Sequence, residues 1–119
     1  MLAAGCDFNP GADRTNCEGF VENLRTLPDT TLVVDSEPFT QDLEGIEPFF
    51  RHTARRDLAY LGTSTGIATT FVNIQGENAT TLVVEPGNPG ISRVTVRAVE
   101  SRCMLSADFA FTVEVVAAN

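Results

Sequence analysis

An alternation of apolar and polar side chains over residues 91–116 is the strongest structural signal in this chain. In residues 91–100 the apolar positions are Val94, Val96 and Ala98, with arginine or threonine between them. A period of two indicates β-strands with one face on a core and the other in water. The linker 101–105 is short enough for a hairpin, so we expect an antiparallel pair with Cys103 near its turn. In residues 106–116 apolar side chains take every second position: Ala107, Phe109, Phe111, Val113 and Val115.

The rest of the chain from residue 28 onward is also typical of strands. Threonine occurs 14 times and valine 12 times, and these β-branched residues suit a pleated, half-buried surface. Proline and glycine divide the sequence about every ten residues, which is the spacing of a sandwich or barrel. The sequence therefore predicts an all-β domain with seven strands, over residues 30–35, 38–43, 58–63, 68–74, 80–85, 91–100 and 106–116.

Residues 1–27 differ in composition from the rest of the chain and are expected to form an N-terminal arm, with the sandwich domain over residues 28–119. The arm holds Cys6 and Cys17 and several acids, and its amphipathic stretch 17–24 could make two helical turns. A chain of 119 residues is near the commonest domain size and has material for one core, not two.

Seven short blocks succeed one another in a particular order and spacing: LPDTTLVV (27–34), EPFTQDL (37–43), LAYL (58–61), IAT (67–69), TLVVEP (81–86), GISRVTVRA (90–98) and LSADFAFTV (105–113). The order of these blocks resembles the bacterial cadherin-like and dystroglycan-type immunoglobulin-like repeats, over about residues 27–116. This resemblance implies a seven-stranded antiparallel Greek-key sandwich that serves as an adhesive, spacer or ligand-presenting module in envelope and secreted proteins.

One departure from the family lies in the segment 49–57. Calcium-binding members carry an acidic loop there, because a hard cation needs several converging oxygens. This chain instead has two phenylalanines and three arginines, and only Asp57 matches, so calcium binding is not carried over. On an extended segment, two adjacent side chains point to opposite faces, so one phenylalanine is expected to be at least partly exposed. We expect this segment to dock an acidic protein partner or a neighbouring copy through Phe49, Phe50, Arg51, Arg55 and Arg56. The alternative is a solvated loop whose arginines pair with the chain's own acids.

The cysteines allow more than one arrangement. Residues 2–6, LAAGC, resemble a bacterial lipobox, which implies lipidation of Cys6 and a membrane anchor. The segments of a signal peptide do not precede this motif, so Cys6 could be lipidated, free or disulfide-bonded. A small sandwich that resembles envelope modules indicates an oxidising compartment and one disulfide. We favour Cys17 with Cys103, which would order the arm, and the alternative is Cys6 with Cys17.

Charge and residue inventory exclude several functions. Eight arginines against sixteen acids give a net charge of −8, which disfavours nucleic acid and anionic lipid, so a membrane contact is expected only through a lipid on Cys6. The only histidine, His52, lacks a nucleophile motif, so we expect no enzyme, no metal and no cofactor. The sequence favours an extracytoplasmic assembly or adhesion module, in the cell envelope, periplasm or at the cell surface, such as a lipoprotein or a filament subunit. The alternative is a carbohydrate-binding module, which is weakened by the absence of tryptophan.

Overall fold

The computed structural model describes residues 17–66 and 69–118, and every regular element in this part of the chain is a β-strand. The strands are β1 (Val21–Asn23), β2 (Thr30–Val33), β3 (Phe39–Asp42), β4 (Phe50–His52), β5 (Ala59–Ser64), β6 (Thr70–Gln75), β7 (Thr81–Pro86), β8 (Gly90–Glu100) and β9 (Leu105–Val116).

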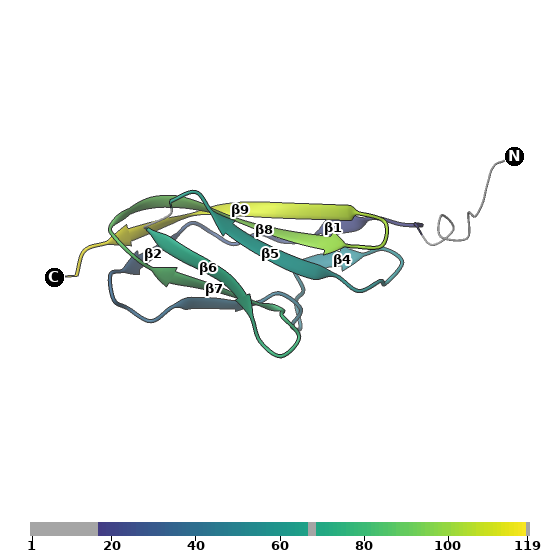
Figure 1. The fold of residues 1–119 in the computed structure, drawn as a ribbon, viewed down its shortest axis with the longest axis horizontal. Coiled ribbons are helices and arrows are strands. Elements are labelled where there is room, and N and C mark those ends of the chain that lie inside the picture. The colour runs from purple at the N-terminus through teal and green to yellow at the C-terminus, as the bar shows by residue number, and fades with distance from the viewer. Residues whose placement is uncertain (1–16, 67–68, 119) are drawn as a thin grey trace, which may run out of the picture.

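The strands form a sandwich of two main sheets (Figure 1). One sheet has the order β2-β9-β8-β5 and the other the order β3-β7-β6. The orders β3-β7-β6 and β5-β8-β9 correspond to strands B-E-D and C-F-G of immunoglobulin-like domains, and β2, as the first strand, is added beside the last one. The predicted all-β, immunoglobulin-like fold is therefore confirmed, and each of the seven expected strands is found within two residues of its predicted bounds.

The pairing differs from the prediction at one point. All pairs were expected to be antiparallel, but β2 runs parallel to β9, with Thr30 opposite Val113 and Val33 opposite Val116. Along β2 the side chains alternate between half-buried and exposed, and Leu32 packs on the core. A sequence pattern of period two is the same for either direction, so it could not distinguish the two pairings.

The long hairpin of β8 and β9 provides one wall of the core. Its register places Val94 opposite Phe111 and Val96 opposite Phe109, all with buried side chains, as the alternation predicts. Leu82 and Val84 of β7 cover them from the other sheet and are fully buried. Because the inner faces of both sheets interdigitate, the core consists mainly of valine and phenylalanine.

A third, small sheet was not predicted. The stretch 17–24, where helical turns were expected, instead contains β1, which pairs antiparallel with β4. A helix of only two turns is marginally stable by itself. Pairing with β4 instead satisfies the hydrogen-bonding capacity of the backbone N–H and C=O groups and buries Val21 in the core. β1 also packs against β8 and β9, so this part of the arm lies along the sandwich.

Candidate functional site

Two loops and the start of the described chain meet at one end of the sandwich. The loop between β4 and β5, residues 53–58, lies beside the β8–β9 turn, residues 101–104, and both line one pocket. Cys17 and Cys103 form a disulfide with their Cα atoms 5.5 Å apart, so the favoured pairing is confirmed. We call residues 17–20, 53–57 and 101–104 the disulfide end.

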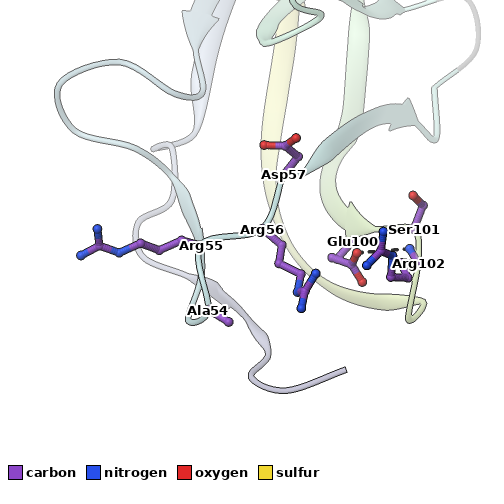
Figure 2. Close-up of a pocket in the computed structure, with 7 residues that line it drawn as sticks. All are labelled: Ala54, Arg55, Arg56, Asp57, Glu100, Ser101 and Arg102. Atoms are coloured by element: carbon purple, nitrogen blue, oxygen red, sulfur yellow. Dashed lines mark hydrogen bonds between the residues drawn. The ribbon is translucent and has the colours of Figure 1, made fainter. Parts of the chain in front are cut away.

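Most of the residues that line this pocket, of about 470 Å³, are polar. Figure 2 shows that Arg56 and Arg102 lie on the side of Glu100, whereas Arg55 projects to the opposite side. Arg55 and Arg56 are adjacent in sequence, but their guanidinium groups therefore point in different directions. It is lined by Ala54, Arg55, Arg56, Asp57, Glu100, Ser101 and Arg102.

Glu100 shapes the turn that carries Arg102. Its side chain is buried, and its carboxylate accepts the backbone N–H groups of Arg102 at 3.2 Å and Cys103 at 2.8 Å. Two such bonds hold the tight turn, in which Met104 adopts a positive φ of 58°. Both carboxylate oxygens already accept hydrogen bonds, so Glu100 acts as a structural acceptor that positions Arg102.

The predicted arginines have three different environments. Arg51 of β4 forms an ion pair with Glu22 of the adjacent strand β1, as in the alternative that the arginines pair with the chain's own acids. Arg56 is half-buried in the pocket. Arg55 is exposed and has no ion pair in the part of the chain that the structure describes. The same holds for Arg102, which was not among the residues predicted from the sequence.

Phe49 and Phe50 do not form part of a surface. Both side chains are 3% exposed, so the expectation that one of them is exposed is wrong. Phe49 stacks on Phe109 with ring centroids 5.6 Å apart, and Phe50 contacts Phe109 at 5.7 Å and Tyr60 at 6.0 Å. Only Phe50 belongs to β4, and the β1–β4 pair closes this end of the core, so both neighbouring rings are enclosed.

His52 is buried too, with 3% of its surface exposed. Its Nδ1 accepts the backbone N–H of Ala54 at 2.9 Å, and no hydrogen bond is found for its Nε2 within the described chain. The backbone N–H of Arg55 donates to the His52 carbonyl oxygen at 2.9 Å. The imidazole therefore holds the turn that presents Arg55.

Two exposed apolar side chains complete the disulfide end. Met104 is 78% exposed and comes directly after the bonded Cys103. Phe20 is 56% exposed, and its backbone N–H donates to Thr53 Oγ1 at 2.9 Å. Thr53 returns a bond from its N–H to the Phe20 carbonyl oxygen at 3.0 Å, which places Phe20 beside the loop of Arg55. Phe20 was not predicted as a surface residue, because its segment was expected to form a helical turn.

Other candidate sites find little support in the described residues. They contain no group of three or more His, Cys, Asp or Glu side chains that could hold a metal. On the strands described, Phe71 is the one exposed aromatic ring, so there is no aromatic platform for a sugar. No helix in residues 17–66 or 69–118 has the length and apolarity to cross a membrane. The predicted lipidation site, Cys6, lies outside the described residues.

Comparison with solved structures gives a likeness to a PKD domain from the KIAA 1837 protein. That domain, with a structure determined in solution, matches at 16% sequence identity and a TM-score of 0.45. The match covers 84% of this chain and 88% of that chain. No family model matches the sequence, and no curated protein matches it. The fold assignment therefore rests on the strand order of the two sheets.

Proposed function

We propose that this domain is a non-enzymatic protein-binding module of the bacterial cadherin-like and dystroglycan-type immunoglobulin-like kind. It acts in assembly or adhesion outside the cytoplasm, in a cell envelope or at a cell surface. Its binding surface is the disulfide end, and its partner presents carboxylates.

The observation that carries this proposal is the pair of exposed arginines, Arg55 and Arg102. Neither has an ion pair in the described chain, although acids outnumber arginines two to one in the sequence. A guanidinium left unpaired in such a chain is available for a carboxylate on another molecule. Phe20 and Met104 lie on the same end, and aromatic residues, methionine and arginine are the types enriched in protein interfaces.

The surface is also held in place before binding. The disulfide ties the 101–104 turn to the start of the described chain, and Thr53 ties Phe20 to the loop of Arg55. Less conformational entropy is then lost when a partner binds, which raises the affinity.

The location outside the cytoplasm is supported by the Cys17–Cys103 disulfide, since such bonds persist in oxidising compartments. A lipid on Cys6 would place the module on a membrane, and mass spectrometry of Cys6 from the native host tests that part of the proposal. The burial of His52 supports a role without catalysis.

The function is tested with an immobilised acidic peptide of alternating glutamate and alanine. The wild type should bind it, and the double variant R55D/R102E should bind at least tenfold more weakly, a loss of about 1.4 kcal/mol. Aspartate is chosen at position 55 because Arg55 has a φ of 63°, a conformation that aspartate tolerates. Higher salt should weaken the wild-type interaction, because exposed charges are screened.

The matched control is R93E. Arg93 is an exposed arginine on the outer face of β8, away from the disulfide end, and it has no ion pair within the described residues. R93E should bind the peptide like the wild type. Equal binding by all three proteins, or none by the wild type, would overturn the proposal.

A further inference from the structure

The opposite end of the sandwich carries a turn with the complementary charge. Residues 34–38 connect β2 to β3 and expose the carboxylates of Asp35 and Glu37, with no basic residue between them. The Ser36 N–H donates to the Val33 carbonyl oxygen at 3.0 Å, and the Val34 N–H donates to the Val116 carbonyl oxygen at 2.9 Å. This turn, which we call the acidic turn, is therefore fixed to the end of β9.

The two ends are separated by the length of the β8–β9 hairpin (Figure 1). Glu100 pairs with Leu105 at the disulfide end, and Gly90 pairs with Val115 beside the acidic turn. An 11-residue strand spans roughly 33 Å at about 3.3 Å per residue. The acidic turn of one molecule therefore cannot reach its own disulfide end, but it can reach that of a neighbour.

Apolar side chains accompany the charges at both ends. Phe20 and Met104 are exposed at the disulfide end, and Val33 and Ile91 are exposed at the end with the acidic turn, at 42% and 69%. Exposed ion pairs alone contribute little to affinity, so the apolar contacts would supply most of the binding free energy. The charges would then set which end meets which.

We propose that a second copy of this chain is the acidic partner, and that its acidic turn docks on the disulfide end. The turn that carries Asp35 and Glu37 in one copy faces the end that carries Arg55 and Arg102 in the next, and the exposed Phe20 and Met104 face Val33 and Ile91. This inference rests on the proposed function, since it names the partner of the same surface. The two surfaces differ and lie at opposite ends, so the contact is head-to-tail and repeats along an open chain of copies.

Sedimentation velocity over a range of protein concentrations tests the proposal. The wild type should associate, and association should weaken as salt is raised. R55D/R102E blocks one surface and D35N/E37R blocks the other, so each should lose at least tenfold in association constant. Asparagine is used at position 35 because Asp35 has a φ of 66°, which asparagine accommodates. Far-ultraviolet circular dichroism and thermal melts confirm that both variants remain folded.

Mixing the two variants gives the decisive measurement. Each retains one intact surface, so an equimolar mixture should form at least 1:1 pairs although neither variant associates by itself. The control T63E adds a charge on the outer face of β5 opposite Thr95, midway between the two ends, and should associate like the wild type. A mixture that stays monomeric, or variants that associate like the wild type, would overturn the head-to-tail contact.

The acidic peptide separates the two proposals. A wild type that binds the peptide through Arg55 and Arg102 but stays monomeric at all concentrations refutes the second copy as partner and leaves the proposed function standing. A wild type that neither binds the peptide nor associates refutes both.

Discussion

At the scale of single residues, burial decides the role of each candidate side chain. Arg51 is neutralised by Glu22 across the β1–β4 pair, whereas Arg55 and Arg102 sit at the tips of turns and have no such neighbour in the described chain. Phe49 and Phe50 occupy the core, although their position beside arginines is typical of an interface. The chemistry available to a partner therefore depends on which side chains the fold leaves uncovered.

Tyr60 provides a prediction at this scale. Burial, then the hydrogen bond that its hydroxyl donates to Glu44, then the negative charges of Glu44 and Asp42 raise its pKa well above the ordinary value. Because the folded pKa lies above the unfolded value of about 10, the stabilisation is complete below pH 10 and is lost as the pH rises further. Stability should therefore fall as the pH rises above 10.

The measurement uses the fact that Tyr60 is the only tyrosine. In an alkaline titration, the near-ultraviolet absorbance of tyrosinate should appear together with unfolding, monitored by circular dichroism. Y60F, which cannot ionise, should lose much of this pH dependence. Tyrosinate absorbance near pH 10 in a folded protein would contradict the assignment.

At the scale of elements, the close approach of β5 and β6 depends on a glycine. Gly62 of β5 points toward the inner face, where a Cβ atom would lie 2.7 Å from Val72 Cγ1 of β6 and 3.5 Å from Leu82 Cδ1. β5 and β6 belong to different sheets, so the missing side chain lets the two sheets meet along this side. Val72 is β-branched and has few alternative rotamers, so moving its side chain away from a Cβ atom at position 62 would cost free energy.

G62A should therefore destabilise the domain by about 1 to 3 kcal/mol, as overpacking of a core does. The melting temperature should fall by roughly 4 °C for each kcal/mol in a domain of this size. T63A is the matched control, because the neighbouring Thr63 is exposed on the outer face of β5 and should change stability little. Equal melting temperatures for both variants would show that β6 can move away without cost.

At the scale of the whole molecule, the Cys17–Cys103 disulfide joins the start of the described chain to the β8–β9 turn across 86 residues of sequence. It closes nearly the entire sandwich into one loop and reduces the freedom of the unfolded chain. It also ties the 101–104 turn to the segment of Phe20, so the same bond bears on stability and on the proposed binding surface.

C17S/C103S should lower the free energy of unfolding by about 2 to 4 kcal/mol, measured by urea denaturation. C6S is the control and should leave the free energy of unfolding unchanged. Where the double variant still folds, it should bind the acidic peptide more weakly, because Arg102 and Phe20 are no longer held together. An unchanged free energy of unfolding would mean that residues 17–24 pack on the sandwich without the bond.

Local sequence patterns were enough to predict the strand content, the positions of seven strands and the inward faces of the last two. A period of two and a break at proline or glycine are both visible over a few residues, so they need no knowledge of the tertiary fold. The favoured disulfide partners, Cys17 and Cys103, also proved correct, although the cysteines allowed another pairing.

How the strands combine, and which side chains remain exposed, became known only from the tertiary structure. The parallel β2–β9 pair, the β1–β4 pair and the enclosure of both Phe49 and Phe50 depend on residues far apart in sequence. Strands of three residues, such as β1 and β4, are too short for a period to be read. Arg55, Arg102, Phe20 and Met104 come to the same end of the sandwich because a disulfide and a pair of hydrogen bonds bring three separate segments together, although Arg55 and Arg102 project to different sides of that end (Figure 2).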